Sequence, residues 1–231
     1  MQLALRDVLK IFQVPEKTVT AWIEKKKMPC VRVNERYRFN TIELLEWALE
    51  SRIPLTLQIL DLAQEGSADS NILSAALTNG KIYYDVPGET RETVLKSVVD
   101  LLPLPTGTDR AALLQLFLAR ELMESTAVGN GIALPHIRNP VVLNIEKPCV
   151  TLCFLRRAVD FRALDQKPVS IVFALLSPSV KMHLAILARL AFCLHNERLQ
   201  KFLDNRARAE EILAEFMILE SRLAAAPENK K

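Results

Sequence analysis

The sequence predicts an α/β fold in which helices flank a mixed β-sheet, preceded by a small helical domain that carries a β-hairpin. Two apolar runs, residues 150–155 and 169–176, are typical of strands buried on both faces. Between residues 71 and 222, strand-like runs alternate with segments of helical apolar spacing, and this alternation predicts a layered α/β domain. Residues 1–52 instead contain three short helical segments and one alternating segment.

Composition and charge limit the classes of protein that this chain can be. It has 231 residues, of which 50% are hydrophobic and 25% charged, as in a soluble globular protein with one large and one small domain. Residues 1–52 contain 10 Lys and Arg against 7 Asp and Glu, whereas the remainder has 20 of each. All of the excess positive charge therefore lies at the N-terminus, which points to a polyanion partner there.

Targeting and cysteine usage predict a cytoplasmic protein. No apolar run approaches the roughly 20 residues that span a bilayer, and the first ten residues are too polar for a signal peptide. We expect all four cysteines to be reduced and mostly buried, and the spacing of Cys149 and Cys153 is a poor metal signal. The sequence predicts neither a metal site nor a cofactor.

The N-terminal segment predicts two helices, a hairpin and a third helix. One amphipathic helix lies within residues 1–13, and after a break at Val14-Pro15 a second begins at Glu16. Residues 31–39 alternate around Asn34-Glu35, which predicts a hairpin with Val31, Val33, Tyr37 and Phe39 on one face and the three arginines on the other. A third helix follows over residues 42–49, with Thr41 as its cap and Trp47 turned inward.

This order of elements resembles the excisionase and MerR-like winged helix-turn-helix family. The resemblance rests on Thr18-Val19, Met28-Pro29, the basic hairpin and Trp47. It implies DNA binding by the second helix and the hairpin, through Lys17, Thr18, Thr20, Lys25, Lys26, Lys27, Arg32, Arg36 and Arg38. The chain departs from the family where Lys26 replaces a usual glycine and Ala21 a frequent arginine. The alternative is a small scaffold domain whose basic surface is only solvated.

A linker and a tail bound the larger domain. Residues 53–70 are too apolar for a free linker, and we expect a short helix there that packs on a neighbour or on a second copy of the chain, as in a homodimer. The α/β domain is expected over residues 71–222, and residues 223–231 form a charged, disordered tail.

The segment GNGIALPH, residues 129–136, is the strongest candidate for a functional site. It places Gly129, Asn130 and Gly131, with two of only six glycines, shortly before His136. Successive backbone N–H groups in such a turn can bind an anion, and the apolar run suits a strand that presents the histidine at a sheet edge. Taken alone, a glycine turn beside a histidine is more often structural.

Together with its flanking residues, this segment resembles the active-site segment of the enzyme IIA proteins of the phosphotransferase system, in the fructose, mannitol and nitrogen-regulatory branch. The resemblance covers residues 119–138 and extends to KMHLAILARLA, residues 181–191. It implies that His136 accepts a phosphoryl group, that Arg120 helps to hold it, and that His183 is the second histidine beside it. Glu124 stands where the family commonly has glycine, and a carboxylate facing the site would weaken phosphorylation unless Arg138 offset it.

The leading hypothesis is a cytoplasmic regulator of the phosphotransferase system, a phosphocarrier component rather than a stand-alone enzyme. A histidine phosphocarrier protein would phosphorylate His136, and the N-terminal domain would bind DNA. The absence of a membrane-spanning sugar-transport segment favours the nitrogen-regulatory type. The competing class is an interaction module that binds a kinase or transporter without phosphoryl transfer, and a third version keeps DNA binding alone. A metal site or a Ser125 or Cys193 hydrolase lacks the required motif.

Overall fold

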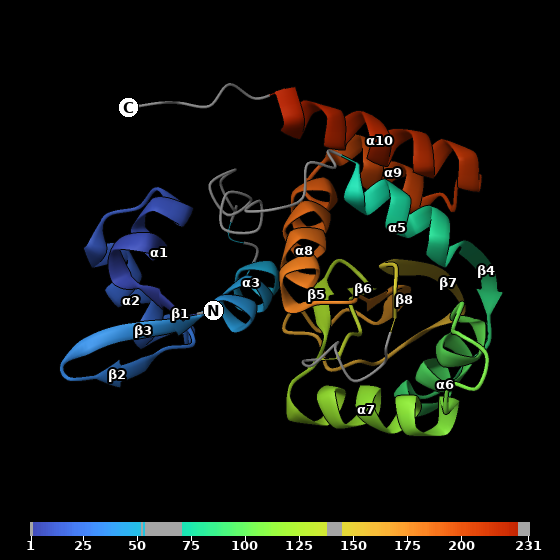
Figure 1. Cartoon of the computed structure of the whole chain (residues 1–231), viewed down its shortest axis with the longest axis horizontal. Coiled ribbons are helices and arrows are strands. Elements are labelled where there is room, and N and C mark those ends of the chain that lie inside the picture. The colour runs from blue at the N-terminus through green and yellow to red at the C-terminus, as the bar shows by residue number, and fades with distance from the viewer. Residues whose placement is uncertain (1, 52, 54–70, 138–144, 226–231) are drawn as a thin grey trace.

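The computed structural model describes residues 2–51, 53, 71–137 and 145–225 (Figure 1). An N-terminal domain lies beside a larger α/β domain, and helix α3 (Thr41–Glu50) lies between the two. The helix expected after residue 53 falls outside the described residues. Within the described ranges no helix is both long and apolar enough to cross a membrane.

The N-terminal domain combines the expected helices with a three-stranded sheet. Its remaining elements are β1 (Gln2–Ala4), α1 (Leu5–Phe12), α2 (Glu16–Lys26), β2 (Val31–Val33) and β3 (Arg36–Asn40). The antiparallel sheet has the order β1-β3-β2, so the first residues form a strand that the sequence did not predict. Asn40 is the cap of α3 in place of Thr41, because its side chain accepts hydrogen bonds from the N–H groups of Ile42 and Glu43.

The hairpin forms where we expected it, but the prediction for its two faces was wrong. Asn34 and Glu35 both have positive φ, which gives a two-residue turn that pairs Val33 with Arg36. Directly opposed residues point to the same face, so Val31 and Val33 share a face with Arg36 and Arg38. Arg32 lies opposite Tyr37 on the other face. The alternation within each strand was read correctly, but the register set by the turn was not.

A five-stranded mixed sheet forms the centre of the C-terminal domain, as predicted. Its order is β4-β7-β8-β6-β5. The strands are β4 (Ile82–Val86), β5 (Ala127–Gly129), β6 (Ile132–Ala133), β7 (Cys149–Val159) and β8 (Val169–Leu176). The pairs β4–β7 and β6–β8 are parallel, whereas β5–β6 and β7–β8 are antiparallel. Residues 149–155 of β7 are all buried and so is nearly all of β8, which explains the apolar character of these two runs, whereas residues 156–158 of β7 are exposed.

Helices cover both faces of this sheet (Figure 1). One face packs against α5 (Ile72–Gly80), α8 (Val180–Leu194), α9 (Glu197–Asp204) and α10 (Ala209–Ala225). The other face packs against α6 (Arg91–Leu101) and α7 (Arg110–Met123). Successive residues of β7 and β8 alternate between these two cores, so Leu152 and Phe154 face the first whereas Cys153 and Leu155 face the second.

The helix ends in this domain follow from local sequence. Asp109 caps α7 by accepting from the N–H of Ala112, and Ser179 caps α8 by accepting from the N–H of Met182. These caps fix the starts of the two helices that carry Arg120 and His183. The last helix continues to Ala225, so residues 223–225 of the expected tail are helical.

A candidate functional site at the contact between the two domains

His136 lies where β6 ends, beside the central strand β8. It forms an isolated parallel bridge with Leu175, whose N–H donates to the carbonyl of Pro135. This short continuation of β6 holds the histidine against the sheet. The ring is buried, with 2% of the residue exposed. The expected phosphorylation of His136 needs an imidazole that is open to a donor protein, but in this conformation helix α3 covers the ring.

Each ring nitrogen of His136 has one hydrogen-bond partner. Nδ1 lies 2.8 Å from the carbonyl oxygen of Leu134. A carbonyl oxygen can only accept, so Nδ1 carries a proton and donates it. Nε2 lies 2.5 Å from Oε1 of Glu46, a residue of α3. In a neutral ring of this tautomer the lone pair is therefore on Nε2, and Nε2 is the nitrogen that can act as a nucleophile.

Arg120 reaches the same carboxylate from the last turn of α7. Its Nη2 lies 2.7 Å from Oε2 of Glu46, and its Nη1 donates to the carbonyl oxygen of Glu124 at 2.8 Å. The guanidinium is buried, and its Nε has no hydrogen-bond partner among the described residues. A fixed cation with a spare donor therefore lies beside the carboxylate that contacts His136.

His183 stands next to His136, as the resemblance implied. It comes from the first turn of α8, and the two imidazole ring centroids are 5.0 Å apart. The pKa of His183 is lowered to about 3, mainly by burial and also by the nearby His136 and Arg120, although Glu46 opposes the shift. The ring is neutral at physiological pH, and its buried Nε2 has no hydrogen-bond partner among the described residues.

Glu46 is the site residue that sequence reasoning missed. Its two carboxylate oxygens divide between Nε2 of His136 and Nη2 of Arg120, and the residue is buried. The remaining cavity, lined by Glu46, Arg120 and His136 among others, has a volume of about 10 Å³, which is about the space of one water molecule. The carboxylate thus fills the space in front of the histidine.

The carboxylate that we suspected, Glu124, does not face the site. Its side chain is exposed, and only its backbone carbonyl contacts Arg120. Arg138, proposed to offset it, lies outside the described residues. The repulsive group expected from α7 is therefore replaced by one from the other domain.

The structure does not bring Gly129, Asn130 and Gly131 to His136. All three have positive φ and close the β5–β6 turn, where the N–H of Asn130 donates to Oδ2 of Asp165 at 2.9 Å. Ile132 pairs with Ile171, whereas His136 pairs with Leu175, four residues further along β8. At about 3.3 Å per residue, the turn lies roughly 13 Å from the histidine.

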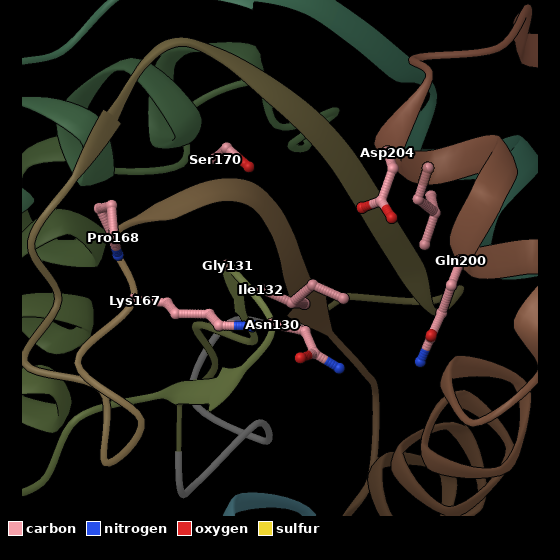
Figure 2. Close-up of a pocket in the computed structure, with 9 residues that line it drawn as sticks. Asn130, Gly131, Ile132, Lys167, Pro168, Ser170, Gln200 and Asp204 are labelled. Carbon is pink, nitrogen blue, oxygen red and sulfur yellow. The ribbon is translucent and has the colours of Figure 1, made fainter.

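The glycine turn borders a different pocket (Figure 2). This cavity has a volume of about 390 Å³. Asn130 and Gly131 line it together with Lys167, from the loop before β8, and with Gln200 and Asp204 of α9. Neither His136 nor Arg120 contributes to it. The four residues between Gly131 and His136 therefore separate the glycine turn from the histidine, although the sequence motif placed the two together.

The predicted DNA-contacting residues lie on α2, on the turn after it and on the hairpin, all of which belong to the N-terminal domain (Figure 1). Six of them are exposed, namely Lys17, Lys25, Lys26, Lys27, Arg32 and Arg36, whereas Thr18, Thr20 and Arg38 are partly buried. Lys27 takes the left-handed conformation that ends α2, so the chain closes this turn without the glycine of the resembled family. Trp47 donates to the carbonyl of Lys26 at 2.8 Å and fastens the turn to α3.

The other reactive side chains do not form a second site. The described residues contain no cluster of three or more His, Cys, Asp or Glu that could hold a metal ion. All four cysteines are free, and burial raises the pKa of Cys149 to about 11 and that of Cys153 to about 12. Ser125 donates to the carbonyl of Phe161. These groups are packed as structural side chains.

Comparison with known proteins defines the class. Residues 75–218 match the family model described as "Phosphoenolpyruvate-dependent sugar phosphotransferase system, EIIA 2", and residues 3–52 match a helix-turn-helix domain. The fold and these matches define an enzyme IIA domain joined to a helix-turn-helix domain. The chain belongs to the type 2 enzyme IIA family of the phosphotransferase system.

Individual relatives include nitrogen regulatory proteins and a sugar-specific component. The chain is 33% identical over 144 residues to a nitrogen regulatory protein of Pseudomonas aeruginosa, covering 61% of this chain and 91% of the relative. It is 31% identical over 142 residues to the fructose-specific EIIA component of Haloferax volcanii, covering 59% and 90%. The crystal structure of nitrogen regulatory protein IIA-Ntr from Neisseria meningitidis superposes with a TM-score of 0.55 at 27% identity, covering 62% and 97%.

Proposed function

We propose that this protein is a regulatory phosphocarrier that accepts a phosphoryl group on Nε2 of His136 and couples its phosphorylation state to DNA binding by the N-terminal domain. The observation that carries the proposal is the grouping of His136, Arg120 and His183. His136 follows β6, Arg120 belongs to α7 and His183 to α8; His136 and Arg120 both contact the Glu46 carboxylate, and His183 lies beside His136. The family match supports the same reading, because phosphoryl groups are what this transfer system moves.

The chemistry needs one nucleophile and a fixed positive environment. The lone pair on Nε2 attacks the phosphorus of a phosphohistidine on the donor, an N–P bond forms, and the donor's N–P bond breaks with its electron pair returning to the donor ring. The Nδ1–H bond to Leu134 holds His136 in the tautomer that leaves Nε2 free to attack.

Arg120 and His183 would stabilise the transferred group. The guanidinium offsets the charge on the phosphoryl oxygens, and its fixed position means that no reorganisation is needed during transfer. The neutral ring of His183 has a buried nitrogen without a described partner, which can donate to a phosphoryl oxygen if it carries the ring proton. The donor would be a histidine phosphocarrier protein, because transfer between two imidazoles needs a phosphohistidine on the other side.

The N-terminal domain would bind DNA through its basic surface. The lysines at the end of α2 and Arg36 on the hairpin are exposed while the two domains are docked, so a duplex can reach them. Lysines in such a place contact phosphates and fix register, whereas base reading would come from the exposed side of α2.

The test is phosphorylation of the purified chain with phosphoenolpyruvate, enzyme I and a histidine phosphocarrier protein, followed by intact mass measurement. We expect an acid-labile mass gain in the wild type and none in His136→Ala. A His195→Ala variant serves as the matched control, because that ring lies at the end of α8 and binds the carbonyl of Ala191. No gain in the wild type with any donor would remove the transfer mechanism.

The burial of His136 favours a second candidate function. Nε2 is hydrogen-bonded to Glu46 and no space is left in front of it, so this conformation cannot accept a phosphoryl group. A module that only binds a kinase or transporter would not need to leave this conformation. DNA binding separates the two. Affinity that falls steeply with salt supports the regulator, whereas no binding to any duplex at low salt supports the interaction module.

A further inference from the structure

We propose that Glu46 is a built-in ligand of the phosphoryl site, so that helix α3 and a phosphoryl group on His136 compete for the same place. While His136 is unphosphorylated, the surface around His136 and Arg120 then binds the carboxylate of Glu46. When His136 is phosphorylated, this surface releases the carboxylate. This inference rests on the proposed phosphoryl transfer to His136.

The carboxylate of Glu46 uses the groups that a phosphoryl group would need. Its Oε1 meets Nε2 of His136 at 2.5 Å and its Oε2 meets Nη2 of Arg120 at 2.7 Å. A carboxylate and a phosphoryl group are both anions with oxygen acceptors, and a guanidinium binds either. Glu46 thus occupies the site as a smaller oxyanion of the same kind.

The contact also disables the nucleophile. Nδ1 of His136 donates to Leu134, so a hydrogen bond at Nε2 requires one proton shared with Oε1 of Glu46. With that proton in place, the lone pair that must attack phosphorus is engaged. The carboxylate also stands where an incoming phosphorus would approach, and the cavity of about 10 Å³ has no room for a phosphoryl group.

Apolar packing shows that the docking of α3 involves more than one ion pair. Leu184 and Ala188 of α8, and Leu223 of α10, belong to the same buried cluster as the core of the N-terminal domain. In the opposite direction, Leu49 of α3 packs into the core of the α/β domain. The helix that carries Glu46 is therefore held by both domains, and the hydrogen bonds of the Glu46 carboxylate add a polar contact to this apolar one.

Phosphorylation would reverse this arrangement. A phosphoryl group brings a charge of about −1.5 to −2 at pH 7 to the place of a neutral nitrogen, directly opposite the Glu46 carboxylate. Like charges at this distance repel strongly in a buried site, and Arg120 would transfer its hydrogen bonds to the phosphate. Helix α3 must then leave, and the N-terminal domain changes its position relative to the α/β domain.

Docking does not cover the predicted DNA-binding surface. Lys25, Lys26, Lys27 and Arg36 are all exposed in this structure, in which the two domains are docked. The switch would therefore change where the DNA-binding domain is held, and leave its basic surface accessible in both states. Regulation would act through domain placement on the duplex.

The first test compares initial phosphorylation rates of the full chain with a saturating histidine phosphocarrier protein. Glu46→Gln keeps the size of the side chain but removes its charge, and we expect about tenfold faster phosphorylation, as when a minor open population becomes the major one. Glu124→Gln is the matched control, because that carboxylate is near Arg120 in sequence but exposed, and its rate should equal that of the wild type. Equal rates in the wild type and Glu46→Gln would overturn the competition.

A second measurement judges docking without any phosphoryl transfer. X-ray scattering of the unphosphorylated chain should give a larger radius of gyration for Glu46→Lys, which places a cation against Arg120, than for the wild type and Glu124→Lys. The N-terminal core residues Leu44, Leu45 and Ala48 are untouched, and thermal unfolding checks that the variant is folded. If the folded Glu46→Lys variant is as compact as the wild type, the docking role is wrong. If scattering changes but no chain accepts phosphate, the proposed function fails and the carboxylate-binding contact remains.

Discussion

Glu46 of the N-terminal domain shares a hydrogen bond of 2.5 Å with His136 of the α/β domain, although 90 residues separate them in the chain. The same carboxylate is 2.7 Å from Arg120. Two domains that resemble separate families therefore meet at the histidine of the transfer site. Glu46 and Arg120 form one ion pair, yet changing them should have opposite effects on phosphorylation.

Arg120→Ala should slow phosphorylation although Glu46→Gln accelerates it. Both changes break the same ion pair, but Arg120 also stabilises the phosphoryl group, and removing one such donor typically costs 10²- to 10³-fold in rate. Initial rates by intact mass, with Arg110→Ala as a control from the start of the same helix, would measure this. Acceleration in both variants would mean that Arg120 only anchors Glu46.

His183 should remain neutral across the physiological pH range and should couple stability to pH. Burial lowers its folded pKa to about 3, below the value of about 6.5 expected in the unfolded chain. Between these values the unfolded chain binds more protons, so the free energy of unfolding falls as pH decreases from about 6.5, by at most about 1.4 kcal/mol per pH unit for this one proton. Above pH 6.5 this contribution is fully present.

Chemical unfolding of the wild type and His183→Gln between pH 4.5 and 7.5 would isolate that term. We expect the wild type to lose more stability on acidification than the variant, while the contributions of the other groups cancel in the difference. Parallel curves would show that His183 is not held neutral by burial.

The basic hairpin should supply part of the salt dependence of DNA binding. Replacing both Arg36 and Arg38 by Ala removes two cations from one face of the hairpin, and the slope of log affinity against log salt should decrease by roughly 1 per lost phosphate contact. Arg157→Ala, an exposed arginine of the α/β domain, should leave the slope unchanged. Fluorescence anisotropy with a labelled duplex at several salt concentrations gives the slopes, and unaltered slopes in the double variant would remove the hairpin from the DNA surface.

Gly80 should tolerate no side chain. A Cβ there would lie 2.1 Å from the carbonyl oxygen of Val150, because α5 ends against β7. We expect Gly80→Ala to lower the free energy of unfolding by about 3 kcal/mol, the upper part of the usual range for overpacking. Gly107→Ala has open space but a positive φ, and about 1 kcal/mol is expected. A Gly80→Ala variant as stable as the wild type would contradict this packing.

Local patterns predicted the elements well because each one is determined by nearby residues. The continuous apolar runs predicted β7 and β8, and Asn34-Glu35 predicted the turn of the hairpin between β2 and β3. The histidines and Arg120 came from the resemblance, and the structure brings them together. Their roles stay predictions.

Two failures have a common physical cause, which is that distance along the chain does not give distance in space. Gly131 is close to His136 in sequence, but an extended strand carries the histidine away from the turn. Glu46 is far away in sequence, and nothing in either domain's own pattern specifies how the two dock. One signal was available, since Glu46 is a charged residue between Leu45 and Trp47 in a helix otherwise apolar over residues 44–49.

The most direct measurement is nuclear magnetic resonance of the phosphorylated protein with ¹⁵N-labelled histidine, of which the chain has only three. Coupling between phosphorus and a ring nitrogen identifies both the residue and the atom. Because Nδ1 of His136 donates to the carbonyl of Leu134, we predict phosphorus on Nε2 of His136. Phosphorus on Nδ1, on His183 or on His195 would contradict the account.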